Sequence, residues 1–414
     1  MTSKVPLRVA FLIENGSYRF DNRALREVGT LRDQGATVTV ICPAYQGETL
    51  YEVMDGVEVY RYRYPELGAS FIGHLGEYAT SLAAIAAITE YLWWKQGFDV
   101  IQAVNPPDLL WMVAAPYKLR GVKFVFDHYD LNPELFEDRF GGSPQLMRAL
   151  PAVRFMERMS IQTADRVIST NYSYAGVATG RCGKDPDDVY VVRNGPDQRH
   201  FRPVEPDPKV RALGRRVIGY LGNMNPQDGL DHFIEMARIL VQDRGRDDFG
   251  FVLIGKGDAW EGIRQLRDRY GLTDRMLMPG RLPLADVVSY LCAADICVQP
   301  DPPGGLNENS TMNKPMEFMA LGKAVVSYDL KETRVTGGDV VQFVPGTAGP
   351  EGLAAKVLEL ADDSDKLAQL HEAGINRVRD VLGWTHQAPT LLAVYESLFP
   401  GFAPEHRGVR CPIR

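Results

Sequence analysis

The sequence predicts an α/β protein of two domains, each built on a parallel sheet with helices on both faces. Short apolar runs typical of buried strands alternate with helical patterns, and this alternation occurs twice. An aperiodic stretch rich in proline, arginine and aspartate separates the two series, and 414 residues are too many for one ordinary core. We expect an N-terminal domain over 1–199, a linker over 200–216, a C-terminal domain over 217–382 and a final helical segment over 383–414.

The first series opens with a short apolar run that Glu14 and Asn15 end at once, so it predicts a first strand rather than a signal peptide. The expected strands are Leu7–Ile13, Thr37–Cys42, Val57–Tyr62, Val100–Ala103, Lys123–Asp127, Arg166–Thr170 and Val189–Arg193. The expected helices are Asn22–Gln34, Gly76–Lys95, Leu109–Arg120 and Leu146–Ala164. The turn residues Asn194, Gly195 and Pro196 close this half.

The second series repeats the pattern after the linker. Its expected strands are Arg216–Leu221, Phe249–Ile254, Met276–Pro279, Ile296–Gln299, Ala324–Ser327 and Val340–Phe343. Its expected helices are Gly229–Gln242, Trp260–Tyr270, Leu284–Ala293, Asn313–Leu321, Gly352–Ala361, Ser364–Val381 and Trp384–Phe399. In open α/β sheets ligands bind outside the carboxyl ends of the strands, so we expect the loops there to line a cleft between the two halves.

Composition excludes some classes of partner. Hydrophobic content of 45% and charged content of 24% are typical of a soluble globular protein, and a net charge of −7 argues against nucleic acid. Five scattered cysteines fit a reducing compartment, so we expect a cytoplasmic protein. The longest apolar stretch, Leu82–Trp94, is too short to span a bilayer; we keep only a weak peripheral membrane contact as an option.

The stretch 299–329, QPDPPGGLNENSTMNKPMEFMALGKAVVSYD, carries the strongest functional signal. A strand ends in a Pro/Gly-rich loop, and a helix then opens near Asn313. The start of a helix offers unpaired N–H groups and the positive end of a dipole, which suit a diphosphate. Ser310, Thr311 or Asn313 could cap this helix. Glu317, one turn in, can accept hydrogen bonds from a pair of sugar hydroxyls, so the stretch suits a nucleotide-sugar.

Eight motifs, in order along nearly the whole chain, resemble retaining glycosyltransferases of family 4, which have the GT-B fold with two Rossmann-like domains. In the first half they are FDNRALREVGTLRDQGATVTVICP (20–43), NPPDLLWMVAAPYKLRG (105–121), FDHYDLNPELF (126–136) and VISTNYSYAGVA with VVRNGPD (167–197). In the second half they are YLGNMNPQDGLDHFIEMARIL (220–240), FVLIGKGDAWEGIRQL (251–266), MPGRLPLADVVSYLCAADICVQP (278–300) and NSTMNKPMEFMALGKAVVSYD (309–329). The likeness is to the bacterial type, and it implies that 383–414 crosses back to the N-terminal domain.

The donor motif departs from the family pattern at its first carboxylate. The Glu-x7-Glu pair of the family would stand at 309 and 317, whereas this chain has Asn309 and Glu317, with Glu308 one position early. By resemblance, the first position contacts the hydroxyls of the donor sugar and the second the ribose. An asparagine can still donate and accept hydrogen bonds, so we expect binding with an altered sugar preference.

The positive charge for the diphosphate is a second departure. After the strand that ends at Leu221, relatives commonly have an arginine and a lysine, and this chain has Asn223 and Asp228. We expect Lys314, Lys256 or Arg281 to replace them, together with the backbone amides of 310–313. The complete donor-binding set predicted here is Gly16, Gly222, Asn223, Lys256, Arg281, Ser310, Thr311, Met312, Asn313 and Glu317.

The catalytic region of the N-terminal half is the third departure. Many relatives have a histidine just before the acidic residue at the position of Asp130, where this chain has Tyr129; His128 is adjacent, and either could face the reaction centre. Asn105 either touches the acceptor or caps the helix at Leu109. The predicted catalytic residues are His128, Asn309 and Lys314, and the predicted acceptor-binding residues are Asn105, Tyr129 and Asp130.

The resemblance implies transfer, with retention, of a hexosyl or hexosaminyl unit from a nucleotide diphosphate sugar to an acceptor hydroxyl. A UDP-sugar is the expected donor, and a polysaccharide, lipid-linked or secondary-metabolite precursor the expected acceptor. No cofactor and no metal ion are expected. Two alternatives remain: a nucleotide-sugar 2-epimerase of the same architecture, which needs acid–base carboxylates around the sugar, and a degenerate protein that only binds the nucleotide-sugar.

Overall fold

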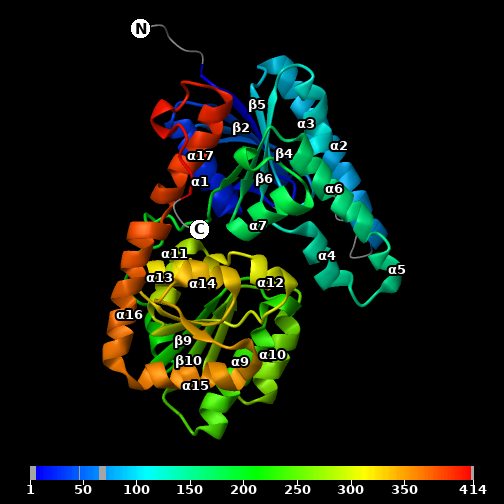
Figure 1. Cartoon of the computed structure of the whole chain (residues 1–414). Helices are drawn as coiled ribbons and strands as arrows, with labels where there is room; N and C mark the ends of the chain where they lie inside the picture. The colour runs from blue at the N-terminus through cyan, green and yellow to red at the C-terminus, as the bar shows by residue number, and fades with distance from the viewer. Residues whose placement is uncertain (1–5, 46, 65–70, 412–414) are drawn as a thin grey trace. The chain divides into compact units, whose positions relative to one another are not determined.

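The computed structural model describes residues 6–45, 47–64 and 71–411, which form two compact units (Figure 1). Unit 1 contains the residues up to Arg193 together with Gln387–Arg414, and unit 2 is Asn194–His386. The division therefore falls ahead of residues 200–216, the stretch expected as a linker. That stretch packs with unit 2, where Val210 is fully buried.

Unit 1 is built on an eight-stranded sheet, with neighbours in the order β3-β4-β2-β1-β5-β6-β7-β8. All neighbours are parallel except β3 and β4. The strands are β1 (Arg8–Leu12), β2 (Thr37–Ala44), β3 (Tyr51–Met54), β4 (Val57–Arg63), β5 (Val100–Val104), β6 (Lys123–His128), β7 (Arg166–Ser169) and β8 (Val189–Val191). Every residue of β5 is buried, as a central strand covered on both faces requires.

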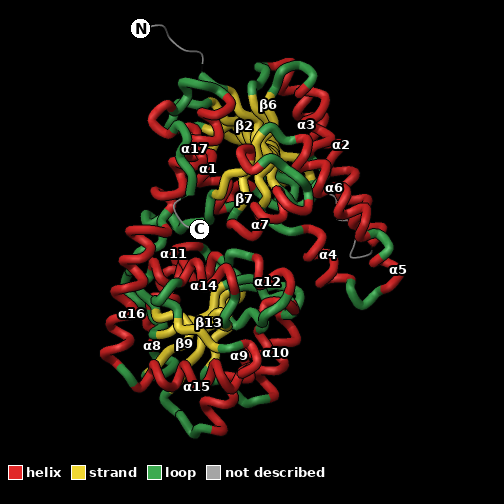
Figure 2. The backbone as a smooth tube through the Cα atoms, viewed as in Figure 1, coloured by secondary structure: helices red, strands yellow, loops and turns green. Residues whose placement is uncertain are grey.

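Helices surround this sheet (Figure 2). They are α1 (Asn22–Asp33), α2 (Phe71–Lys95), α3 (Trp111–Lys118), α4 (Asn132–Phe140), α5 (Pro144–Met147), α6 (Leu150–Thr163), α7 (Tyr172–Gly176) and α17 (Trp384–Leu398). Helix α1 begins where the Asp21 carboxylate accepts hydrogen bonds from the amides of Arg23 and Ala24, which satisfies two of the free N–H groups at its start.

Unit 2 is built on a six-stranded, fully parallel sheet with neighbours in the order β11-β10-β9-β12-β13-β14. The strands are β9 (Arg216–Leu221), β10 (Phe249–Ile254), β11 (Met276–Gly280), β12 (Ile296–Gln299), β13 (Ala324–Tyr328) and β14 (Gln342–Val344). The aromatic rings of Phe233, Phe249 and Phe251 pack together in its core.

The helices of unit 2 lie on both faces of its sheet. They are α8 (Pro208–Arg211), α9 (Leu230–Arg238), α10 (Trp260–Arg269), α11 (Leu284–Cys292), α12 (Gly305–Asn309), α13 (Asn313–Ala320), α14 (Lys331–Gly337), α15 (Gly349–Asp362) and α16 (Ser364–Arg377). The predicted fold class, two parallel-sheet α/β domains, is thus confirmed.

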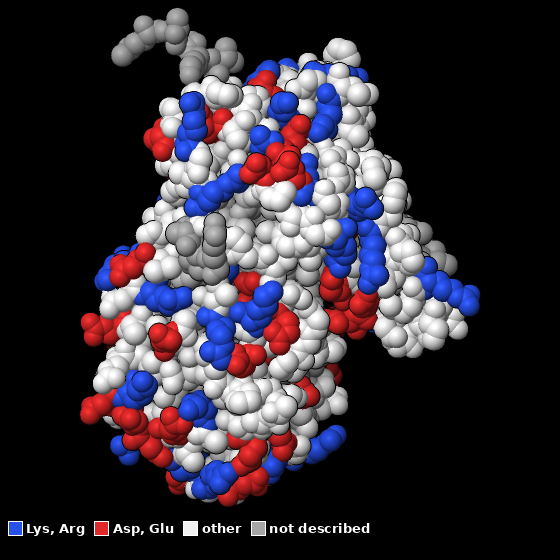
Figure 3. Space-filling view, viewed as in Figure 1, with Lys and Arg blue, Asp and Glu red and all other residues white. Residues whose placement is uncertain are grey.

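Charged side chains are mixed in sign over the face drawn in Figure 3, where Lys and Arg alternate with Asp and Glu. Some charged side chains of the protein also form ion pairs, such as Arg246 with Asp248 and Asp362. This face therefore presents no broad basic surface of the kind that binds nucleic acid.

Candidate functional site

Three neighbouring strands of unit 2 end in glycines with a left-handed backbone. Gly222 follows β9, Gly255 follows β10 and Gly280 ends β11, with φ of 154°, 133° and 82°. The Gly222 amide donates to the Ile254 carbonyl at 3.1 Å, and the Gly255 amide donates to the Gly280 carbonyl at 2.9 Å. A Cβ on Gly255 would lie 1.8 Å from the Gly222 oxygen. The strand ends therefore stay free of side chains, so a ligand can approach the backbone closely.

A buried ion pair lies beside this glycine edge. The ammonium of Lys314, in the first turn of α13, donates to both carboxylate oxygens of Asp301 at 2.8 Å and lies 5.0 Å from the centre of the Tyr220 ring. Burial would lower the pKa of Lys314, but the attraction of Asp301, Tyr220 and Asp228 outweighs it and raises the pKa. A Cβ on Gly222 would lie 3.7 Å from Lys314 Cε. The predicted cation is thus present at the edge, with its charge balanced by Asp301.

The turn after β9 carries polar and acidic groups. Asn223 is exposed, and its carbonyl accepts a hydrogen bond from the Tyr220 hydroxyl at 2.6 Å. Asp228 accepts from the Asn225 amide at 2.8 Å, and burial raises the pKa of its carboxyl. These two residues shape the turn and supply no positive charge.

Lys256 and Arg281 are exposed and follow β10 and the glycine that ends β11. Neither makes an ion pair with any residue that the structure describes. Because exposed and unpaired cations keep their full charge, these two are the free positive groups among the cations predicted for this edge. Their side chains and the bare backbone of the glycines lie at the ends of adjacent strands.

The loop after β12 contains a helical turn that the sequence did not predict. Helix α12 places Asn309 at its end, where the side-chain amide donates to the Gly305 carbonyl at 2.8 Å. The Glu308 carboxylate accepts from the Lys331 amide at 3.0 Å, at the start of α14. Glu308 therefore braces the next helix.

Helix α13 begins after Met312, which has an extended backbone and makes no side-chain cap. The structure thus puts Met312 at the N-cap position, where the sequence suggested Ser310, Thr311 or Asn313. Asn313 is the exposed first residue of the helix, Ser310 is buried, and Thr311 and Met312 are half-buried. Glu317, the fifth residue of α13, is also half-buried.

In unit 1, the side chain of Asn105 makes all of its hydrogen bonds to other residues of the protein. Its side-chain oxygen Oδ1 accepts from the backbone amides of Tyr129 at 2.6 Å and Asp130 at 3.1 Å. Its side-chain nitrogen Nδ2 donates to the Asp108 carboxylate at 3.0 Å and to the Asp130 backbone carbonyl at 2.7 Å. It does not cap the helix at Leu109; it fixes the turn after β6 instead. Asn105 therefore positions the predicted acceptor residues and has no hydrogen-bonding capacity left for an acceptor.

His128 points into unit 1. Its ring is fully buried between Phe126 and Tyr174, with centroids at 5.8 and 5.3 Å, and neither ring nitrogen has a hydrogen-bond partner within the described residues. Burial, and then the charge of Arg181, lower the pKa of His128 to about 3. The neutral ring has no exposed surface from which to reach a ligand, so the structure places this predicted catalytic residue in the core.

Tyr129 and Asp130 are the half-buried residues of this turn. The guanidinium of Arg23 lies 5.0 Å from the centre of the Tyr129 ring, whose hydroxyl has no partner in the described part of the chain. Burial raises the pKa of Asp130 to about 6. Gly16, in the loop after β1, has nothing within 4 Å of a Cβ built on it, so sterics do not require glycine there.

The sequence did not predict a buried polar network that ties β5, β6, α1 and α17 together. The Arg23 guanidinium pairs with Glu27 at 3.0 Å and Asp127 at 2.9 Å, while the Gln102 amide donates to Glu27 at 2.7 Å. The Tyr395 hydroxyl of α17 donates to Gln102 at 2.5 Å. Burial first, and then the nearby Asp127, raise the pKa of Glu27 well above its usual value although Arg23 opposes this.

Two kinds of feature are not found among the described residues. No three His, Cys, Asp or Glu side chains gather closely enough to hold a metal ion. No helix there is long and apolar enough to cross a membrane.

Comparisons with known proteins match both halves of the chain. Residues 21–195 match the family profile "Glycosyl transferase 4-like domain", and residues 215–363 match "Glycosyl transferases group 1". The 2-deoxystreptamine glucosyltransferase of Streptomyces kanamyceticus is 26% identical over 255 residues, which cover 59% of this chain and 64% of that protein. The matched segment thus spans slightly less than two thirds of that relative.

Solved structures share the whole architecture at low sequence identity. Sucrose-phosphate synthase from Thermosynechococcus elongatus superposes with a TM-score of 0.73 at 18% identity, over 95% of this chain and 99% of that one. Anabaena HepE in complex with UDP and glucose superposes with a TM-score of 0.68 at 16% identity, over 94% of this chain and 100% of that one. These similarities establish the fold as GT-B.

Proposed function

The chain carries two glycosyltransferase domains in the GT-B fold, and on this premise we propose that it transfers a hexosyl or hexosaminyl unit from a UDP-sugar to an acceptor hydroxyl. The observation that carries the donor assignment is the glycine edge of unit 2, where Gly222, Gly255 and Gly280 leave bare backbone beside the start of α13. The bare backbone lets a ligand approach closely, and the unpaired amides at the start of α13 suit a diphosphate. Uridine as the base is supported by HepE, a GT-B neighbour solved with UDP.

Departure of the nucleoside diphosphate is the step that this edge would assist. Negative charge develops on the leaving phosphate, and fixed donors aimed at it lower the barrier. The amides at the start of α13, the exposed Lys256 and Arg281, and the Lys314–Asp301 dipole are the groups available. Asn309 and Glu317 are proposed for the sugar hydroxyls and the ribose, by resemblance to the family motif.

We propose retention at the anomeric carbon, with attack from the face that the diphosphate leaves and the leaving phosphate accepting the acceptor proton. The resemblance to family 4 supports this course. No metal ion or other cofactor is proposed to take part. Asp301, beside the glycine edge, has both carboxylate oxygens bound to Lys314 and so is not free to ligate a metal ion.

The acceptor is proposed to bind to unit 1 near the turn that holds Tyr129 and Asp130. This turn is fixed by Asn105 and lies at the carboxyl end of β6, where ligands of parallel sheets bind. A ring-shaped polyol acceptor is supported by the relative that glycosylates 2-deoxystreptamine. The half-buried Tyr129 and Asp130, rather than the buried His128, are the proposed contacts.

Incubation of the protein with a panel of nucleotide sugars, with and without candidate acceptors, tests the proposal. A transferase releases UDP in step with glycoside formation, and the product keeps the anomeric configuration of the donor. The matches give no support to the epimerase alternative, which would change the sugar without lasting release of UDP. A protein that only binds would gain thermal stability from UDP without any turnover, and that result would refute the transfer reaction.

A further inference from the structure

A carboxylate is buried without a cation in the loop after β5 of unit 1. Only 3% of Asp108 is exposed, and within the described residues it forms no ion pair. Its two oxygens accept instead from side-chain amides, Oδ1 from Asn105 at 3.0 Å and Oδ2 from Asn132 at 2.8 Å. Because burial of an unpaired charge is costly, its presence indicates that two accepting oxygens are needed at this position.

Asn105 connects Asp108 to the turn after β6. Its Oδ1 accepts from the backbone amides of Tyr129 and Asp130, while its Nδ2 donates to Asp108 and to the Asp130 backbone carbonyl. Only one orientation of the side chain satisfies these contacts, because an exchange of Oδ1 and Nδ2 would turn a donor toward two backbone amides. Since Asp108 can only accept in its ionised form, it fixes which way Asn105 faces.

The second oxygen of Asp108 holds the far side of the same turn. Asn132, which donates to it, is the first residue of α4, and the N-cap residue Leu131 makes no side-chain hydrogen bond. The Ser160 hydroxyl of α6 donates to the Asp108 backbone carbonyl at 3.1 Å and so ties the loop after β5 to that helix. One carboxylate therefore links this loop to both ends of the segment 129–132.

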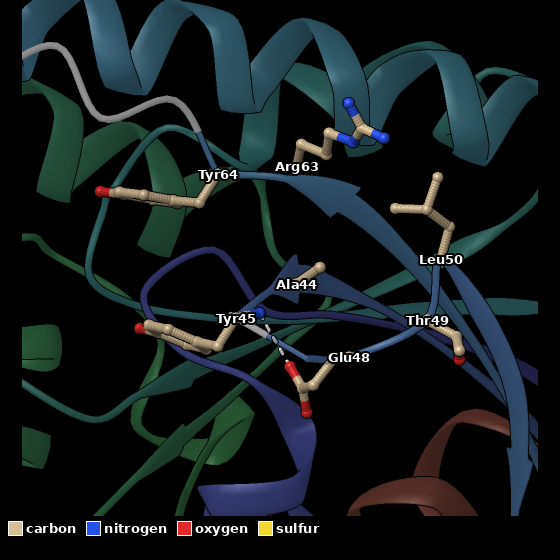
Figure 4. A pocket seen from close by; sticks show the side chains of 7 residues that line it. All are labelled: Ala44, Tyr45, Glu48, Thr49, Leu50, Arg63 and Tyr64. Atoms are coloured by element: carbon tan, nitrogen blue, oxygen red, sulfur yellow. Dashed lines mark hydrogen bonds between the residues drawn. The ribbon is translucent and has the colours of Figure 1, made fainter.

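A hollow of about 720 Å³ on the same edge of the sheet is separate from this turn. It opens at the carboxyl ends of β2 and β4, where Tyr45 and Tyr64 lie at its side (Figure 4). Glu48 in its wall accepts from the Tyr45 amide at 2.9 Å. Strand β1 lies between β2 and β5, and neither Asp108 nor Asn105 lines the hollow. The hydrogen bonds of Asp108 therefore act on the turn after β6.

We propose that Asp108 is a positioning residue for the acceptor: its carboxylate orients Asn105, and Asn105 holds both backbone groups of Asp130. The Asp130 carboxyl is half-buried and has no hydrogen bond or ion pair in the described part of the chain. A fixed backbone holds that carboxyl in place for an acceptor hydroxyl. This inference rests on the proposed function, because it concerns the acceptor contacts named there.

The charged groups around Asp108 come from several elements, and most are acidic. Glu157 of α6 and Asp130 direct negative charge toward it, and Arg181 pairs with Glu157 at 2.6 Å. The remaining titratable groups on this side are His128 of β6, Tyr78 of α2 and Cys182, between α7 and β8. Burial first, and then Glu157 and Asp130, raise the pKa of Asp108 to about 7, although the amides that bind it oppose the rise.

Hydrogen exchange of the Tyr129 and Asp130 backbone amides tests the hold on the turn without any acceptor. Asp108→Asn keeps the shape of the side chain but turns a donor toward one of the two amides that it binds. We expect both backbone amides to exchange at least about tenfold faster in this variant at about pH 8. The matched control is Asp165→Asn, since Asp165 accepts from the Phe124 amide at 2.8 Å near the other end of β6. The control should leave exchange of the turn unchanged, and unchanged exchange in Asp108→Asn overturns the proposal.

Binding of two ring polyols, 2-deoxystreptamine and glucose, to the full chain tests the role in acceptor binding. In saturation-transfer NMR at about pH 8, Asp108→Asn should weaken the ring that binds the wild-type protein by about tenfold and leave the affinity for UDP within about twofold. A purely structural role would lower the folded fraction and change neither dissociation constant. Unchanged affinity for the ring in a folded Asp108→Asn protein counts against the proposal.

The pH profile gives a second measurement on the wild-type protein. As the pH falls through the pKa of Asp108, about 7, one of its oxygens gains a proton and stops accepting. Affinity for the ring should therefore rise about threefold from about pH 6.5 to about pH 8.5, and Asp108→Asn should lack this rise. Titration of the ring itself affects both proteins equally. Should Asp108→Asn fail to fold, a flat profile in the wild-type protein still rejects the proposal.

The donor reaction is read separately on the same wild-type protein. A rise in melting temperature with UDP, together with ring binding that does not depend on Asp108, leaves the proposed function standing and rejects the positioning role. Absence of any response to UDP, or binding of neither ring to the wild-type protein, counts against the proposed function. The exchange rates of the turn then still decide whether Asp108 holds it.

Discussion

Lys314 and Asp301 form an ion pair in the interior of unit 2, and this pairing limits how the lysine can interact with a ligand. The ammonium sits between two carboxylate oxygens at 2.8 Å, with both side chains buried. The pair as a whole is neutral, so it offers a diphosphate a dipole, whereas the exposed Lys256 and Arg281 offer whole charges. In the function that we propose, charges on other elements take the place of two cations expected after β9.

Replacing Lys314 with methionine should destabilise unit 2 by about 3–5 kcal/mol, because Asp301 is left as an unpaired buried charge. The double variant Lys314→Met/Asp301→Asn should recover most of that loss, and urea unfolding measures both. A double variant as unstable as the single one would show that pairing is not what holds Lys314. In the recovered protein, the affinity for UDP reports the contribution of the pair to donor binding.

Glu14→Gln should stabilise the protein at pH 8 and change little at pH 4.5. The carboxyl has a pKa of about 7 when folded against a usual 4.5, so its favourable contribution is complete below 4.5 and is lost as the pH rises through 7. A shift of that size corresponds to about 3 kcal/mol above pH 8. Melting temperatures of both proteins across this range provide the measurement, and equal curves would mean that Glu14 is not buried as the structure shows.

At the scale of elements, α17 is joined to the sheet of unit 1 by a hydrogen bond across the network of Arg23, Glu27 and Gln102. Tyr395→Phe removes the donor and leaves the Gln102 oxygen unsatisfied in the interior. We expect a loss of about 1–3 kcal/mol in the free energy of unfolding. Tyr91→Phe, at a site 55% exposed, is the control and should change stability little. Denaturant titration of both variants measures the two changes in the free energy of unfolding.

The buried strands were predictable because a parallel sheet covered on both faces imposes continuous apolar runs, as in β5 and β10. Strand β3 was missed although Asp55-Gly56 is a hairpin signal: Asp55 has φ of 49° and Gly56 of 80°, which the tight turn requires. The short helices α12 and α14 were missed because elements of five and seven residues carry no readable period.

The candidate site was only partly predictable. A glycine directly after a buried strand pointed to Gly222, and the same signal would have found Gly255. Nothing in the sequence pairs Lys314 with Asp301, because a short helix lies between them and the contact exists only once β12 and α13 have packed. The sequence left open whether His128 or Tyr129 faces the reaction centre, because a shift of one residue along an extended segment changes the face, and in the structure the histidine is the one that lies in the core.

At the scale of the whole molecule, unit 2 is continuous in sequence and unit 1 is not. Residues 194–386 expressed alone should therefore melt cooperatively and be stabilised by UDP, since the glycine edge and α13 are all within them. Residues 1–193 alone lack α17 and should fail to give a protected core by hydrogen exchange. The control joins 387–414 to 1–193 through a flexible linker, which should restore protection. A protected core in residues 1–193 alone would show that α17 is dispensable to unit 1.

The split in unit 1 has a consequence for how the chain is made. Residues 387–414 leave the ribosome only after all of unit 2, so the first sheet to be translated waits for the last segment to complete it. Until then Gln102 and Glu27 lack the cover that Tyr395 gives them. Nascent chains stalled after unit 2 has emerged but before residues 387–414 have emerged should therefore recruit chaperones to unit 1, while unit 2 is already native.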